Sequence, residues 1–135
     1  MDQPVSTIMV IDLITVEITD TLKDVANVFE NIKIRHLPVM AGETLVGIVS
    51  HSDVHRMKHF CQVLESGDKD LFEELNSVSV KALMKVPKTI SKSQTIREAT
   101  EILATSHFHC LPVVDQGELV GIVTTTDILR YTLKQ

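Results

Sequence analysis

The sequence has few aromatic residues and no tryptophan, which limits what its core can be made of. Four Phe and one Tyr are the aromatic side chains of a 135-residue chain that is 44% hydrophobic. A core must therefore be built from Val, Ile, Leu and Met side chains. The length suits one compact domain or two very small domains in close association.

The chain also lacks paired cysteines and long apolar runs. Cys61 and Cys110 are far apart and form no CxxC motif, so we interpret both as small buried thiols in a reducing compartment. No apolar run approaches the ~18 residues that span a bilayer. The first four residues lack the basic and apolar regions of a signal peptide. These features predict a soluble, cytoplasmic protein without a membrane partner.

Positive charge is in short supply as well. The chain has 13 Lys and Arg against 18 Asp and Glu, a formal net charge of −5. Nucleic-acid backbones are bound by clustered Lys and Arg, so we expect no nucleic-acid partner. A small anionic ligand is still compatible with this charge if basic side chains gather at its site.

The sequence contains an internal repeat. A shift of 74 residues places Leu45–Val49 on Leu119–Val123 and Leu37–Val39 on Leu111–Val113, and it gives 12 identities over positions 13–56. The stretch 5–9 matches 80–84 at a shift of 75. A single period in so short a chain indicates two pseudo-symmetric halves rather than a solenoid.

Both halves have the same order of predicted elements. Apolar residues at helical spacing follow a short β segment, and two apolar runs separated by a turn then lead into a second helix. The predicted strands are 15–16, 37–40 and 45–49, and 89–90, 109–113 and 119–123. Helix caps are predicted at Asp20 and Ser93, and the last helices near Ser52 and Thr126.

This order predicts an α+β fold of two β-α-β-β-α repeats packed sheet to sheet. The predicted boundaries are 1–66 for the first repeat, 67–79 for a helical connector with an acidic face, and 80–135 for the second repeat. Pro38 and Pro112 are expected at a strand start or edge, because proline donates no ladder hydrogen bond.

One motif recurs where a strand runs into a helix. Ser50 precedes Asp53 by three residues, and Thr124 precedes Asp127 by the same spacing. Backbone N–H groups at a helix N-terminus attract phosphate, and a carboxylate beside them can accept both hydroxyls of a ribose. Ordinary helix capping explains either copy alone, so the motif leaves both interpretations open. Its duplication favours ligand binding.

With these motifs the sequence resembles a tandem CBS domain pair, the Bateman module, named for cystathionine β-synthase. The resemblance rests on Gly-Ile-Val-Ser/Thr-x-x-Asp at Gly47–Asp53 and Gly121–Asp127, and on the x-Leu-Pro-Val strands at Arg35–Val39 and His109–Val113. It covers essentially the whole chain.

The resemblance implies a set of ligand-binding residues in each half. It implies ribose-binding acids at Asp53 and Asp127, phosphate-binding hydroxyls at Ser50 and Thr124, adenine-lining side chains at Ile34 and Phe108, base-reading backbone at Ile14 and Lys88, and phosphate-facing pairs at Arg35-His36 and His109-Cys110. Lys88 replaces a usually apolar residue, and Cys110 is neutral, so the two sites are expected to be unequal.

Two catalytic interpretations are set aside. His51, His55 and His59 form one stripe of a helix, but the stretch lacks the Glu of the HExxH motif, and no further ligand completes a zinc site. Ser50, His51 and Asp53 are too close in sequence for triad geometry. The chain also has no Gly-x-Ser-x-Gly elbow. We therefore expect neither a metal nor an enzyme activity.

The resulting hypothesis is a regulatory sensor that needs no cofactor. An adenosine ligand is expected in the clefts that the two repeats form: AMP, ADP or ATP first, and S-adenosylmethionine or a dinucleotide next. Binding is expected to shift a homodimer or the interaction with a separate regulated protein. The alternative is a dimerisation or interaction module that needs no ligand.

Overall fold

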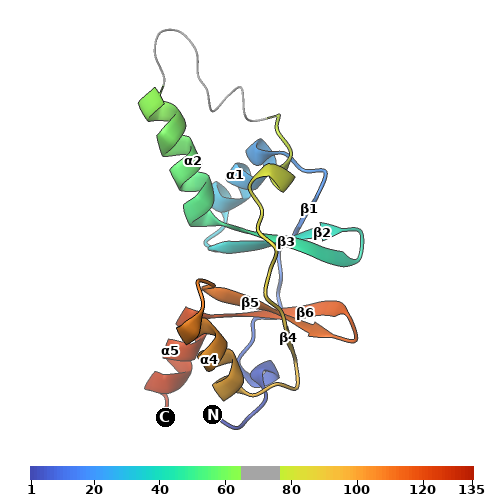
Figure 1. The fold of residues 1–135 in the computed structure, drawn as a ribbon, viewed down its shortest axis with the longest axis vertical. Helices are drawn as coiled ribbons and strands as arrows, with labels where there is room; N and C mark the ends of the chain where they lie inside the picture. Colours follow the sequence, from blue (N-terminus) through green and yellow to red (C-terminus); the bar gives the residue numbers. More distant parts are fainter. Residues whose placement is uncertain (65–76) are drawn as a thin grey trace. The chain divides into compact units, whose positions relative to one another are not determined.

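The computed structural model describes residues 1–64 and 77–135, and the side chains of all of these except 61–64. These residues form two three-stranded sheets, each accompanied by helices (Figure 1), which confirms the predicted α+β class with its two repeats. Residues 67–76 of the predicted connector and the side chain of Cys61 lie outside what is described.

The first sheet has the order β1-β2-β3, with β1 parallel to β2 so that Val16 faces Val39. The elements of this half are β1 (Val16–Glu17), α1 (Leu22–Asn31), β2 (His36–Ala41), β3 (Thr44–Ser50) and α2 (His51–Leu64). The predicted strands and helices are all present, with ends that differ by one or two residues.

The second sheet repeats this arrangement in the order β4-β5-β6. Here β4 is parallel to β5, and β5 is antiparallel to β6 with Leu111 opposite Val123. The elements are β4 (Ile90–Ser91), α4 (Ile96–Thr105), β5 (Cys110–Asp115), β6 (Glu118–Thr124) and α5 (Thr125–Leu133).

The predicted caps of the first helix in each half are wrong. In both halves the cap is a threonine whose N–H donates to the carboxylate of the residue three positions later, while the backbone N–H of that residue donates back to the threonine hydroxyl: Thr21 with Asp24, and Thr95 with Glu98. This reciprocal capping box satisfies two free helix donors at once. Asp20 instead accepts the Glu17 amide, 2.9 Å from Oδ2, and closes the preceding turn.

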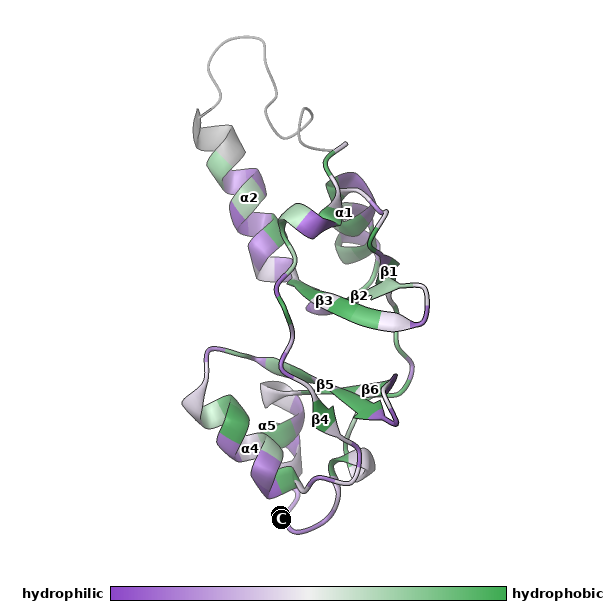
Figure 2. Ribbon diagram, turned by 45° about the vertical axis from the view of Figure 1, so that its right-hand side comes forward, coloured by the Kyte–Doolittle hydropathy of each residue, from purple (hydrophilic) through white to green (hydrophobic). Residues whose placement is uncertain are grey.

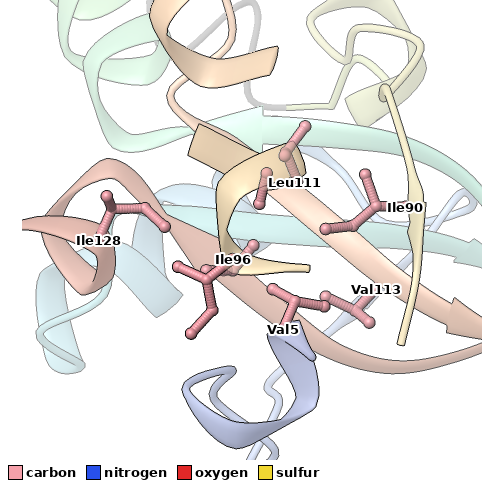
Figure 3. Close-up of a cluster of buried hydrophobic side chains, with 8 residues drawn as sticks. Val5, Ile90, Ile96, Leu111, Val113 and Ile128 are labelled. Atoms are coloured by element: carbon pink, nitrogen blue, oxygen red, sulfur yellow. The ribbon is translucent and has the colours of Figure 1, made fainter. Parts of the chain in front are cut away.

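The segments that precede the two repeats in sequence are exchanged between the halves. The short 3₁₀ helix η2 (Val80–Ala82) places fully buried Val80 in the core of the first half, with Val25, Leu37 and Val49. The equivalent turn η1 (Val5–Thr7) places Val5 in the core of the second half, beside Ile96 and Val113 in Figure 3.

This exchange decides which residues form each compact unit. One unit consists of Thr15–Gly42 and Val46–Val86, and the other of Met1–Ile14, Glu43–Leu45 and Pro87–Gln135. Backbone hydrogen bonds hold both 3₁₀ turns in place: Val80 N–H donates to the Asp20 carbonyl over 2.8 Å, and Val5 N–H donates to the Gln94 carbonyl over 2.7 Å. Each half therefore depends on residues from outside its own repeat.

The hydrophobic residues concentrate on the strands, as the colouring of β3 and β6 in Figure 2 shows, whereas α2 carries mixed polarity. Among the described residues, no helix combines the length and apolarity needed to cross a membrane.

Candidate functional site at two strand-to-helix junctions

The first junction lies where β3 ends and α2 begins. Ser50 is the last residue of β3, and Asp53 is in the first turn of α2. The Asp53 N–H donates to Ser50 Oγ over 3.0 Å, which caps the helix. Asp53 is the buried acidic residue of the described core, with 8% of its surface exposed. The sequence motif thus places a hydroxyl and a carboxylate side by side.

Two cations hold the Asp53 carboxylate. Arg56, one turn along α2, forms an ion pair with Oδ1, and Lys85 Nζ lies 3.5 Å from the same oxygen. Burial by itself raises the pKa of Asp53, but hydrogen bonds from Ser50 and Arg56 and the charge of Lys85 outweigh it, so the pKa is lowered. Asp53 is consequently ionised at neutral pH.

Lys85 reaches this junction because its backbone pairs with β3. The Lys85 and Ile48 backbones exchange two hydrogen bonds of 2.9 Å each. The close approach requires Gly47, since an ideal Cβ there would lie 2.4 Å from Met84 Sδ. Sequence reasoning missed Lys85, because it lies 32 residues from Asp53 and outside every predicted motif.

The second junction lies between β6 and α5 and is capped more completely. Thr124 is the N-cap of α5: its N–H and hydroxyl donate to Asp127 Oδ2 over 2.8 and 2.9 Å, and the Asp127 N–H donates back to Thr124 Oγ1 over 3.2 Å. The Asp127 side chain is 11% exposed, and Arg130 Nη1 lies 3.9 Å from Oδ1.

The second half has no lysine where the first has Lys85. The segment that follows η1 pairs with β6 through Val10 and Ile122, in the way that Lys85 pairs with Ile48. Gly121 again allows the approach, because its Cβ would lie 2.5 Å from Met9 Sδ and 3.1 Å from the Val10 carbonyl. The two junctions therefore share a backbone arrangement, and Lys85 gives the first a charge that the second lacks.

The remaining predicted residues of the first repeat are three near the start of β2 and Ile14, which precedes β1 in sequence and belongs to the other compact unit. Ile34 and His36 are half-buried, Arg35 is exposed, and Ile14 is 37% exposed. The Arg35 carbonyl accepts the N–H of His51 over 2.7 Å, which ties the segment before β2 to the start of α2. Ser50, Asp53 and the Arg35 backbone thus meet at one junction.

Their counterparts in the second half follow the same plan with different chemistry. Phe108 is half-buried, Lys88 and His109 are exposed, and the His109 carbonyl accepts the Thr125 N–H over 3.0 Å. Cys110 is 5% exposed, and burial raises the pKa of its thiol to about 12. At this position the second half offers a neutral buried thiol where the first half offers His36.

Two histidines of the α2 stripe, His51 and His55, make ring contacts. The rings of His51 and His55 stack with centroids 6.2 Å apart, and the rings of His51 and Phe29 are nearly perpendicular with centroids 5.5 Å apart. Within the described residues no three His, Cys, Asp or Glu side chains converge as metal ligands would.

The fold and its duplicated junctions define a tandem pair of small α+β domains, and the family follows from comparison. The model of the CBS domain family matches residues 5–59 and again 80–134. The chain therefore belongs to the CBS domain family and contains two CBS domains, which confirms the resemblance inferred from the motifs.

Curated relatives include much longer enzymes. The chain is 35% identical over 119 residues to the inosine-5′-monophosphate dehydrogenase of Korarchaeum cryptofilum, a match that covers 87% of this chain and 22% of that enzyme. The corresponding dehydrogenase of Methanocaldococcus jannaschii is 30% identical, with 91% and 22% covered. The chain thus spans about a fifth of the length of these relatives.

Solved structures of similar length share the fold. The CBS-pair protein CBSX2 of Arabidopsis thaliana, in complex with AMP, is 28% identical with a TM-score of 0.78, covering 98% of this chain and 97% of that one. A structure described as a putative acetoin utilization protein of Vibrio cholerae is 26% identical with a TM-score of 0.76, covering 99% and 93%.

Proposed function

We propose that this chain is a regulatory sensor that binds an adenine nucleotide, with AMP as the first candidate. The observation that carries the proposal is the pair of junctions in which a nearly buried aspartate sits three residues after a capping hydroxyl, at 8% exposure for Asp53 and 11% for Asp127. The likeness to CBSX2, which was solved with AMP, supports the choice of ligand.

The proposed chemistry uses the two oxygens of each carboxylate. A carboxylate offers about four lone-pair positions, and Asp127 uses Oδ2 for the Thr124 amide and hydroxyl. Oδ1 has Arg130 at 3.9 Å, beyond hydrogen-bonding distance. A ribose 2′,3′-diol would donate to this oxygen. The phosphate would meet the positive end of the α5 dipole.

The residues implied by the family resemblance complete the proposed sites. Half-buried Ile34 and Phe108 would pack against the base, and the backbone of Ile14 and Lys88 would read its edge. The side chains of Arg35, His36 and His109 would face the phosphates and supply positive charge that the chain as a whole lacks. ADP, ATP, S-adenosylmethionine and a dinucleotide are the further candidates.

Regulation would follow from differential affinity. A ligand shifts a conformational or assembly equilibrium only by the difference between its affinities for the two states. The proposed readout is a homodimer or a separate partner protein. Leu129 and Leu133 lie one turn apart on α5 and are 60% and 85% exposed, which makes this helix a candidate dimer surface.

A ligand-independent interaction module is the second candidate. It is favoured by the fact that both aspartates already have partners: Asp127 within its capping box and Asp53 with Arg56 and Lys85. On this view the aspartates only stabilise helix starts, and the exposed leucines of α5 carry the function.

A thermal-shift panel with AMP, ADP, ATP and S-adenosylmethionine separates the two candidates. A ligand at 100 times its Kd stabilises a one-site protein by about 2.7 kcal/mol. The sensor proposal expects such a shift for at least one nucleotide. No shift with any of the four would leave the interaction module as the function.

Asp24→Asn is the matched control for Asp127→Asn. Both residues close a Thr-x-x-Asp capping box, but Asp24 caps α1 and is not part of a Gly-Ile-Val-Ser/Thr-x-x-Asp motif. Each substitution weakens a reciprocal capping box, so each should lower the unliganded stability. Asp127→Asn should also reduce the nucleotide-induced thermal shift, whereas Asp24→Asn should not. Asp53→Asn should reduce the thermal shift that arises from the first half. Equal ligand shifts in the Asp24 and Asp127 variants would contradict ribose binding.

A further inference from the structure

The two junctions differ in one feature that the sequence motif does not contain. Both offer an aspartate at the same position of a helix, but in the first half Lys85 Nζ lies 3.5 Å from Asp53 Oδ1. The backbone position that pairs with the neighbouring strand in the second half holds Val10, which carries no charge. Both halves place a glycine against a methionine where these two segments meet: Gly47 against Met84, and Gly121 against Met9.

Lys85 contacts the carboxylate oxygen that a ribose would need. Oδ1 of Asp53 already accepts from Arg56, and Lys85 approaches the same atom. Arg130 has the place of Arg56 in the second half, at 3.9 Å from Asp127 Oδ1. An arginine therefore occupies this position in both junctions, although only Arg56 also hydrogen-bonds its aspartate, and a lysine is present at the first junction alone.

The position of Lys85 is fixed by its backbone rather than by the ion pair alone. Two hydrogen bonds of 2.9 Å to Ile48 hold its Cα beside β3, although its side chain is 65% exposed. Its partner Asp53 is 8% exposed. A tethered ammonium next to a nearly buried carboxylate has a high effective concentration there, so an incoming hydroxyl pair must compete with it.

We propose that Lys85 is an intramolecular competitor for the ribose at Asp53, and that it makes the first half a weaker nucleoside site than it would otherwise be. This inference rests on the proposed nucleotide-binding function and assigns a specificity-determining role to a residue outside the family motif. Val10 leaves the equivalent carboxylate in the second half without such a competitor.

The test isolates each half by removing the other aspartate. In an Asp127→Asn background, Lys85→Met should tighten the binding of AMP about 2- to 5-fold by calorimetry, the size expected when a partly exposed ion pair no longer has to be broken. In an Asp53→Asn background, Val10→Lys should weaken AMP by a similar factor, since Val10 is 43% exposed and a lysine is accommodated there. Lys81→Met, an exposed charge of the same segment, should change neither.

Binding of adenosine and of 2′-deoxyadenosine tests whether the ribose 2′-hydroxyl is a group that competes with Lys85. Adenosine has no phosphate, so the gain from Lys85→Met should persist with it, and it should be smaller with 2′-deoxyadenosine, which lacks one of the two competing hydroxyls. Weaker AMP binding after Lys85→Met would overturn the proposal and make Lys85 a ligand contact. An equal gain with both nucleosides would overturn it as well.

Failure of the proposed function gives a different result. If AMP binds neither single-aspartate background, with or without Lys85, the nucleotide-sensor function fails and this inference fails with it. If AMP binds both backgrounds but Lys85→Met and Val10→Lys have no effect, the function stands and the competitor role is wrong.

Discussion

Because the two 3₁₀ turns are exchanged between the halves, we expect truncation of Val80 to destabilise the first half more than the second. This residue begins the second repeat in sequence but is fully buried in the core of the first half. Val80→Ala removes two methyl equivalents, worth about 1.6 kcal/mol at roughly 0.8 kcal/mol each. The cavity left behind raises the expected cost to about 2–3 kcal/mol.

Hydrogen exchange read by mass spectrometry can localise this loss. A destabilisation of 2–3 kcal/mol corresponds to roughly 30- to 150-fold faster exchange of amides that exchange through opening of the first half. We expect the acceleration in β2 and β3, and a smaller one in β5 and β6. Val5→Ala should reverse the pattern, because Val5 is fully buried in the core of the second half.

The matched control for this prediction is Val86→Ala. Val86 is six residues further along the same segment and is 82% exposed, so the same chemical change should cost almost nothing there. If Val80→Ala accelerated exchange more in β5 and β6 than in β2 and β3, the assignment of this segment to the first core would be refuted. So would equal effects of Val80→Ala and Val86→Ala.

Three further predictions follow from single contacts. Gly47→Ala should destabilise the first half by about 1–3 kcal/mol in denaturant unfolding, because the new Cβ would lie 2.4 Å from Met84 Sδ. An unchanged unfolding midpoint would show that Met84 does not pack tightly against Gly47. The lowered pKa of Asp53 gives stability that is fully present above the ordinary value of 3.8 and is lost as pH falls through the lower folded-state pKa. Asp53→Asn should therefore flatten the acid limb of the stability profile, and an unaltered limb would contradict the ion pairs. Cys110 should resist iodoacetamide at pH ~8 in a Cys61→Ser variant, since its thiol pKa is about 12, and rapid alkylation of the native protein would contradict its burial.

The fold could be predicted from sequence because each signal was local and duplicated. The apolar runs at Leu45–Val49 and Leu119–Val123 gave buried strands of the expected length. The caps were missed by one or two residues, because several polar residues precede each helix. Only the Thr-x-x-acid spacing at Thr21 and Thr95 singles out the residue that can form a reciprocal capping box.

The parts that could not be predicted are long-range. The similar stretches at 5–9 and 80–84 indicate matching turns, but nothing local states which half receives each one. The pairing of Lys85 with Asp53 depends on that choice, because η2 and the residues after it run along β3. For this reason the candidate ribose acids were found from the sequence motif, whereas the charge that distinguishes them was not.

The most direct test of the account is a crystal structure of the protein grown with AMP. The account predicts density for AMP whose ribose hydroxyls lie within hydrogen-bonding distance of the Asp127 carboxylate, with the phosphate near the start of α5. AMP bound away from both aspartates, or crystals without AMP at saturating concentration, would contradict it.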